Sequence, residues 1–229
     1  MHTMTVSDGA EAFDVTVLGD PRSSRTVLFS VGSGGDPGRH LPLLTALAEG
    51  GLVVAPHFER LATPRPSADQ LTLRARRLSL AVEAVGAEDG PVAGIGHSIG
   101  ATVLLALAGA RMWLGPATSL DVVPIQRLRR VALLAPAAGY FLAPGAVDAV
   151  RAPVLAWIGS EDPVTPPSQL ELLADGLRDL TEVDLRVAAG GGHFSFLHEP
   201  PPGVPEPLGD REAFLAEMCA DLVRFVSEN

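Results

Sequence analysis

The sequence predicts an α/β fold in which a mostly parallel central sheet is covered by helices on both faces. Short apolar runs rich in Val, Leu, Ile and Ala alternate along the chain with longer segments of helical periodicity. Some of the short runs are apolar at every position, which is typical of strands buried on both faces. The chain has 229 residues, enough for one such sheet, so we expect a single domain over residues 1–229. The expected strands are 13–18, 26–31, 52–55, 91–95, 130–135, 153–158 and 185–188.

Three of the expected helices are marked by their first residues. Ser67 opens the sequence Ser-Ala-Asp-Gln, a capping box in which the serine and glutamine side chains satisfy free backbone N–H groups. A Pro-Pro-Ser sequence at 166–168 begins another helix, since proline is tolerated in the first turn. Asp210 is the expected N-cap of the last helix, whose apolar residues recur at helical spacing.

Two segments fit neither a strand nor a long helix, and we interpret them as short cap-like segments. Residues 111–127 place Gly and Pro within an apolar sequence, which favours a loop or a short hairpin over the end of the sheet. Residues 137–150 offer only one short helical stretch, at 145–150. These segments have room for a minimal lid and none for a large one.

Composition and charge exclude several classes of function. The chain has 17 basic and 27 acidic side chains, a formal net charge of −10 and an isoelectric point of about 5.0, which argues against a nucleic-acid-binding surface. All of its cations are arginine, so mechanisms that need a lysine amine are excluded. We interpret Arg74, Arg76 and Arg77, on the helix that follows Ser67, as solvated charges.

The sequence favours a soluble, cytoplasmic protein without a metal or a cofactor. Its first residues lack the basic and apolar regions of a signal peptide, and its longest apolar stretch, 99–110, is too short to span a membrane. The single cysteine, Cys219, excludes an intramolecular disulfide and a CxxC site. No two histidines have the spacing of a zinc motif, so we expect no metal site. The oligomeric state stays open.

The most informative motif is Gly-His-Ser-Ile-Gly at 96–100. An apolar strand, 91–95, precedes it and an apolar helix, 101–108, follows it. In a sharp turn from strand to helix the two backbones crowd together, and glycines on either side of Ser98 leave its hydroxyl exposed. The segment also fits a loose dinucleotide-binding loop, which is disfavoured by its position in mid-chain and the lack of an acidic strand end about 20 residues later.

A serine nucleophile needs a base within hydrogen-bond reach and a carboxylate that orients the base. Asp162 follows an apolar strand at the carboxyl edge of the predicted sheet, where the sites of α/β proteins gather. His193 lies in a glycine-rich loop after the last expected strand. We therefore expect Ser98, Asp162 and His193 to act together, and we prefer them to the neighbouring candidates Glu161 and His198.

The Gly-His-Ser-Ile-Gly motif, the Gly-Ser-Glu-Asp-Pro-Val turn at 159–164 and the Gly-Gly-His-Phe loop at 191–194 together resemble the α/β-hydrolase superfamily. Within it, the chain is similar to compact hydrolases of the dienelactone hydrolase type, although serine stands where those enzymes carry cysteine. The resemblance implies the α/β-hydrolase fold and a catalytic triad of Ser98, Asp162 and His193.

The resemblance also implies an oxyanion hole, formed by the backbone N–H after the nucleophile and by one from a loop after an early strand. These donors correspond to Ile99 and to the loop 31–36, where Val31 takes the place of the family's histidine. Ser33 N–H is our preferred second donor, with Gly34 N–H as the alternative.

The expected reaction is acyl transfer: hydrolysis of a small to medium carboxylic ester or thioester through an acyl-enzyme. A non-catalytic ligand-binding protein, or a peptidase, C–C hydrolase or haloperoxidase with the same triad, remain as alternatives. For His57, pocket lining and structural packing are equally open. The expected partner is a small ester-type molecule, and the predicted open, apolar pocket is lined by His57, Phe58, Trp113, Phe141 and Phe194.

Overall fold

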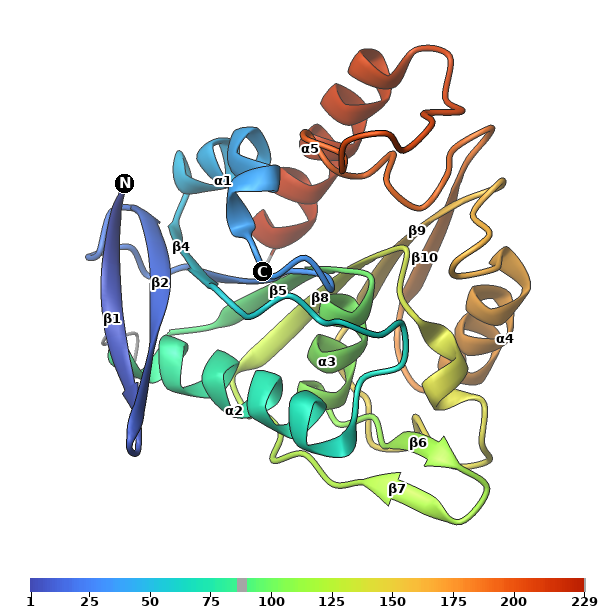
Figure 1. Ribbon diagram of the computed structural model, residues 1–229, viewed down its shortest axis with the longest axis horizontal. Coiled ribbons are helices and arrows are strands. Elements are labelled where there is room, and N and C mark those ends of the chain that lie inside the picture. Colours follow the sequence, from blue (N-terminus) through green and yellow to red (C-terminus); the bar gives the residue numbers. More distant parts are fainter. Residues whose placement is uncertain (86–89, 229) are drawn as a thin grey trace.

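The computed structural model describes residues 1–85 and 90–228. The central sheet of this described part (Figure 1) consists of β1 (His2–Asp8), β2 (Glu11–Gly19), β3 (Thr26–Ser30), β4 (Leu52–Pro56), β5 (Val92–His97), β8 (Leu128–Leu134), β9 (Val154–Gly159) and β10 (Val183–Ala188). Their spatial order is β1-β2-β4-β3-β5-β8-β9-β10. The pairs β1–β2 and β2–β4 are antiparallel, and the pairs from β4 to β10 are parallel. The mostly parallel sheet predicted from the sequence is confirmed.

Helices cover both faces of the sheet (Figure 1). One face is covered by α1 (Leu41–Ala48) and α5 (Arg211–Ser227), whose buried leucines and methionine join one apolar cluster with the strands. The other face is covered by α2 (Ala68–Ala84), α3 (Ile99–Leu107) and α4 (Pro167–Leu177), which share a second cluster. The sheet therefore separates two apolar cores, as expected for this fold class.

The strands expected from the apolar runs are all present, with small shifts at their ends. The sequence analysis missed β1 and α1. The residues of β1 are largely exposed, and only Val6 and Asp8 are buried, so the strand carries little apolar signal. For α1, the N-cap residue His40 makes no side-chain hydrogen bond to the helix, and a cap of this kind leaves no mark in the sequence.

The predicted helix caps form the expected hydrogen bonds. Ser67 Oγ accepts a hydrogen bond of 3.2 Å from the Gln70 backbone N–H, and Gln70 Oε1 accepts one of 2.9 Å from the Ser67 N–H. Asp210 Oδ1 accepts a hydrogen bond of 3.0 Å from the Ala213 N–H at the start of α5. Each cap satisfies backbone groups that the first helical turn leaves free.

The segment 111–127 contains a short hairpin of β6 (Met112–Gly115) and β7 (Thr118–Leu120), which lies at the lower edge of the molecule in Figure 1. This hairpin is one of the two structures that the sequence favoured for the segment. None of the helices in the described residues is long and apolar enough to cross a membrane.

The segment 137–150 contains a 3₁₀ helix, Ala138–Phe141, but the helical stretch expected at 145–150 is absent. Turns replace it, with hydrogen bonds such as that from Val150 N–H to the Val147 carbonyl oxygen at 2.9 Å. Bonds between residues three apart make tight turns and do not propagate an α-helix. The segment is therefore a turn-rich connection to β9.

The interpretation of three arginines of α2 as solvated charges was wrong for two of them. Arg74 is only 2% exposed and Arg77 only 7%. Arg77 Nε donates a 3.0 Å hydrogen bond to Asp8 at the end of β1, and Arg76 also binds Asp8 although its own side chain is largely exposed. Burial alone would raise the pKa of Asp8, but the hydrogen bonds and charges of Arg76 and Arg77 outweigh it and hold this pKa below its usual value.

We predict that Arg77→Met destabilises the fold at pH 7 by about 1–3 kcal/mol, because it leaves the buried Asp8 carboxylate with fewer partners. Since the pKa of Asp8 is lowered by folding, the stabilisation is present above the unfolded-state pKa and is lost as the pH falls through the folded-state pKa. Urea unfolding in a pH series measures both effects. Arg76→Met is the matched control and costs less than about 1 kcal/mol, since this side chain is exposed. Equal losses in the two variants would contradict the assignment.

Candidate active site

Three sequence-predicted residues follow three parallel strands at the same edge of the sheet. Ser98 follows β5, Asp162 follows the end of β9, and His193 lies in the loop after β10. Because parallel strands share one direction, their carboxyl ends bring residues from distant parts of the chain together. The site is thus assembled by the sheet topology.

Ser98 occupies a sharp turn between β5 and α3. Its φ is 55° and its ψ is −128°, a strained backbone conformation for a residue with a side chain. A Cβ at Gly96 would lie 2.7 Å from the Ala101 nitrogen, and a Cβ at Gly100 would collide with the Ser30 carbonyl oxygen. Both positions require glycine because strand, helix and the neighbouring β3 meet at the turn. Ser98 is left partly exposed at this turn.

Continuous hydrogen bonds link the three predicted residues. Ser98 Oγ lies 2.9 Å from His193 Nε2, and His193 Nδ1 lies 2.8 Å from Asp162 Oδ2. His193 and Asp162 are 5% and 4% exposed, so the accessible member of the set is the serine. An ionised carboxylate accepts a hydrogen bond from Nδ1–H, which leaves the unprotonated Nε2 able to accept the serine hydroxyl proton.

The Asp162 carboxylate is surrounded by donors. Its Oδ1 accepts hydrogen bonds from the backbone N–H groups of Val164 at 2.7 Å and Thr165 at 2.9 Å, and its Oδ2 accepts one of 2.6 Å from Thr165 Oγ1. Burial acts to raise the pKa of Asp162, but His193 and Thr165 together hold it below its usual value. Asp162 is therefore ionised at neutral pH and can orient the imidazole.

Thr165 is a site residue that sequence reasoning missed. Its Oγ1 lies within hydrogen-bond distance of Asp162 Oδ2, of His193 Nδ1 at 3.2 Å and of the Ala135 carbonyl oxygen at 3.3 Å. A threonine three residues after an aspartate, as in Asp-Pro-Val-Thr, is a local pattern for turns in which the carboxylate binds following N–H groups. That pattern was the available signal.

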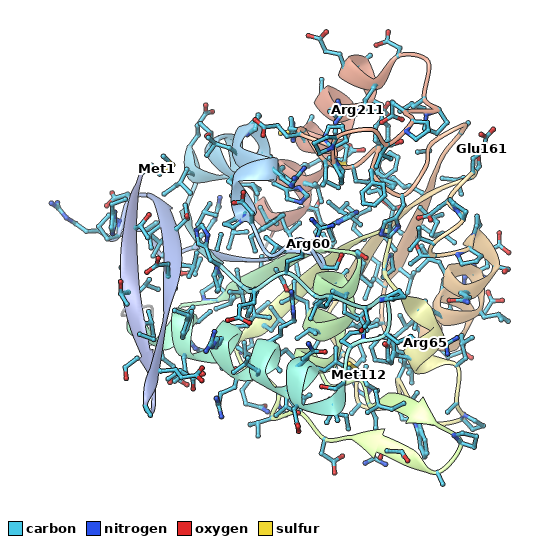
Figure 2. The ribbon with its side chains drawn as sticks, in the orientation of Figure 1. Met1, Arg60, Arg65, Met112, Glu161 and Arg211 are labelled. Atoms are coloured by element: carbon cyan, nitrogen blue, oxygen red, sulfur yellow. The ribbon has the colours of Figure 1, made fainter. Side chains whose placement is uncertain are left out.

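The two rival residues lie elsewhere. Glu161 is exposed at the periphery of the molecule (Figure 2). Its neighbour Asp162 is the residue that is hydrogen-bonded to His193. His198 is half-buried in the segment that leads to the last helix, where its backbone N–H binds the Arg39 carbonyl oxygen. The structure therefore brings Asp162 and His193 together with Ser98, and places Glu161 and His198 apart from them.

His97 points into the protein and supports the loop that carries His193. Its Nε2–H donates a 3.0 Å hydrogen bond to the backbone carbonyl oxygen of His193, and its ring centroid lies 5.0 Å from the His193 ring. Burial, and then the nearby His193 and His40, keep the pKa of His97 well below its usual value, so the ring is neutral. His40 continues the row of rings at 5.7 Å, and burial lowers its pKa to about 3.

The predicted oxyanion-hole residues flank Ser98. Ile99 is the first residue of α3, where backbone N–H groups have no partner within the helix. On the other side, a Cβ at Gly32 would lie 3.4 Å from Ser98 Cβ, so the loop 31–36 passes directly beside Ser98. Ser33 and Gly34 are both exposed in this loop. The preference for the Ser33 N–H over the Gly34 N–H as the second oxyanion donor stays a prediction.

Two of the predicted pocket residues, Phe194 and Phe58, have contacts on loops beside the site, and a third, His57, contacts β2. The Phe194 ring meets the His193 ring edge-on with centroids 5.1 Å apart, which places it next to His193. The Phe58 backbone N–H binds the Gly35 carbonyl oxygen of the loop beside Ser98. His57 Nε2 lies 2.7 Å from Thr16 Oγ1 on β2, a contact that favours structural packing for this residue.

The other two predicted pocket residues belong to the cap-like segments. Phe141 is 4% exposed and packs in the apolar core beneath the 3₁₀ helix. Trp113 lines two cavities of about 350 and 410 Å³ beside the β6–β7 hairpin. The described residues that line these cavities do not include Ser98. It therefore stays a prediction that Trp113 and Phe141 form part of the wall of the site.

The fold that carries this site is similar to the folds of known proteins. No protein-family model and no curated protein matches the chain. Among solved structures, an esterase from Pyrococcus furiosus matches with a TM-score of 0.69 at 12% identity, over 98% of this chain and 91% of that one. A putative α/β hydrolase from Agrobacterium tumefaciens matches with a TM-score of 0.67 at 16% identity, over 97% and 95% of the two chains.

Esterase 2 of Thermogutta terrifontis, in a form phosphoramylated by tabun, matches with a TM-score of 0.64 at 16% identity, over 99% of this chain and 97% of that one. All three similarities extend over nearly the whole of both chains, while the identities are low. The chain has the α/β-hydrolase fold, the fold of the superfamily that its sequence motifs resemble.

Proposed function

We propose that this protein is a serine hydrolase that cleaves a carboxylic ester or thioester of small to medium size through an acyl-enzyme. The observation that carries the proposal is the hydrogen-bonded series Ser98–His193–Asp162, in which only the serine is accessible. Similar solved structures include esterases, one of which reacts with the organophosphorus compound tabun. A binding protein has no need for a buried base and acid aligned behind a partly exposed serine.

In the proposed mechanism His193 Nε2 takes the Ser98 hydroxyl proton while Oγ attacks the substrate carbonyl carbon. Asp162 holds the imidazole in the required tautomer and offsets the positive charge that develops on it. The N–H groups of Ile99 and Ser33 bind the oxyanion, each contributing about 3–4 kcal/mol to transition-state stabilisation. The tetrahedral intermediate collapses to the acyl-enzyme, and the leaving alcohol or thiol takes its proton from His193.

Water then repeats the sequence on the acyl-enzyme. His193 accepts a proton from water as the oxygen attacks the acyl carbon, and it returns that proton to Ser98 Oγ when the carboxylic acid leaves. Atoms and charges balance with water as the only co-substrate. The proposed chemistry needs no metal and no cofactor. Phe194 and Phe58, on loops that border the triad, are the aromatic residues proposed to contact the substrate.

We predict that a fluorophosphonate probe adds once to the wild-type protein and not to Ser98→Ala, as measured by intact mass. Ester hydrolysis in Ser98→Ala falls by at least about 10³-fold, because the nucleophile is lost while substrate binding remains. Ser119→Ala is the matched control, since Ser119 lies exposed on the β6–β7 hairpin, and it keeps both labelling and activity. Folded wild-type protein without an adduct would favour the ligand-binding alternative.

We predict that Asp162→Asn lowers kcat by about 10⁴-fold with a small change in KM. The asparagine oxygen can still accept from the Val164 and Thr165 N–H groups, which turns its amide NH₂ toward His193 Nδ1 and imposes the wrong tautomer. Glu161→Gln, at the exposed neighbouring position, leaves kcat unchanged. A larger loss in Glu161→Gln than in Asp162→Asn would show that the acid has been assigned to the wrong residue.

A further inference from the structure

Arg74 is a buried arginine that binds backbone carbonyl groups beside the candidate site. Its Nη1 donates hydrogen bonds of 3.1 Å to the Val31 oxygen and 3.2 Å to the Gly32 oxygen, and its Nη2 donates one of 3.3 Å to the Glu59 oxygen. The side chain is 2% exposed, and burial lowers its pKa to about 10, so it remains charged at neutral pH. Burying a guanidinium is unfavourable unless its donors find partners, and three backbone carbonyl groups supply them here.

The carbonyl groups that Arg74 binds control the direction of the next N–H groups. In a trans peptide the C=O of one residue and the N–H of the next point in opposite directions. No cis peptide bond occurs among the described residues. Because the Gly32 carbonyl points at Arg74, the Ser33 N–H of the same peptide plane points away from Arg74. The bond to the Val31 carbonyl fixes the preceding peptide plane in the same way.

Further contacts tie Arg74 and the loop into one unit. The Phe58 ring lies 4.6 Å from the centre of the Arg74 guanidinium, and the Phe58 N–H donates to the Gly35 carbonyl oxygen at 2.9 Å. The Leu61 N–H donates to the Ser33 carbonyl oxygen, also at 2.9 Å. The peptide that carries the Ser33 N–H is therefore held on both sides, next to the turn that carries the nucleophile.

We propose that Arg74 is a positioning residue for the oxyanion hole: its guanidinium holds the Val31 and Gly32 carbonyl groups so that the Ser33 N–H faces the substrate oxyanion. The inference rests on the proposed function. A carbonyl bound to a cation also polarises its peptide, which makes the N–H on the other side of that peptide a stronger donor. Arg74 thus acts on the transition state through Ser33 and touches no reacting atom.

The test compares Arg74→Met and Arg74→Lys with the wild type. One readout is kcat and KM for p-nitrophenyl acetate. The other is the pKa of the hemiketal that Ser98 forms with a simple alkyl trifluoromethyl ketone, followed by ¹⁹F NMR, because the ionisation of this adduct reports the strength of the oxyanion hole. Arg76→Met, on the same helix and bound to Asp8, is the matched control.

We expect Arg74→Met to lower kcat by about 10-fold to 100-fold, less than the loss of a whole oxyanion donor, with KM changed by less than about 2-fold. The hemiketal pKa rises by about one to two units in parallel, since a tenfold loss of stabilisation corresponds to one unit. Arg74→Lys falls between Arg74→Met and wild type, because an ammonium group lacks the fork that spans several carbonyl groups. Arg76→Met matches the wild type in both readouts.

A wild-type kcat and hemiketal pKa in folded Arg74→Met would overturn the proposal and leave Arg74 a purely structural role. If Arg74→Met does not fold, the same two readouts in Arg74→Lys decide, and wild-type values there would again overturn it. Wild-type protein that neither hydrolyses the ester nor forms the hemiketal would overturn the proposed function itself. That outcome differs from an active wild type with insensitive Arg74 variants, so the two failures are distinguishable.

Discussion

The close crossing of β5 and α3 at Ser98 is the constraint on which the candidate site depends. The turn holds a residue with a side chain at φ 55°, a conformation that costs on the order of 1–3 kcal/mol. The surrounding packing offsets this cost, since every residue of β5 and of α3 is buried. A helix that is apolar on all sides can only be stable inside a core, so the same residues that bury α3 also fix the direction of the serine.

The buried polar groups around His193 form a second constraint. Asp162, Thr165 and His97 make hydrogen bonds at this site to one another, to backbone groups or to His193. Such networks are costly when incomplete and rigid when complete. The network joins the carboxyl ends of β5, β9 and β10, and it depends on the register of the parallel sheet. A shift of one strand would separate the base from its acid.

Sequence patterns predicted the parts of this structure that depend on local order. Strands buried on both faces were visible as apolar runs, and the capping residues Ser67 and Asp210 marked helix starts, because both signals arise from residues close together in the chain. The motifs around Ser98, Asp162 and His193 were recognisable for the same reason, since each is a short segment at the end of a strand.

Contacts between residues far apart in the chain could not be predicted from such local patterns. Arg77 meets Asp8 from 69 positions away, and Arg74 meets Val31 from 43 positions away, so hydropathy alone classed both arginines as solvated. The bond from His97 to the backbone of His193 likewise depends on tertiary proximity. Long arginine side chains can bury their stems and guanidinium when carbonyl or carboxylate partners are supplied by the fold. A polar residue on a predicted helix face is therefore weak evidence of exposure.

The two sides of the candidate site differ in how they are held, and this bears on what the site selects. The acid and base are fixed by buried hydrogen bonds, and the loop at Ser33 is fixed by Arg74 and by backbone bonds to the Phe58 segment. The walls predicted for the site lie on loops and on the segments 111–127 and 137–150, which consist of turns, a short hairpin and a 3₁₀ helix. Preorganisation of the catalytic atoms determines the reaction class, whereas loop side chains determine substrate choice. The short motifs around Ser98, Asp162 and His193 therefore bear on the proposed reaction class, acyl transfer, and the loop side chains bear on the choice of acyl group.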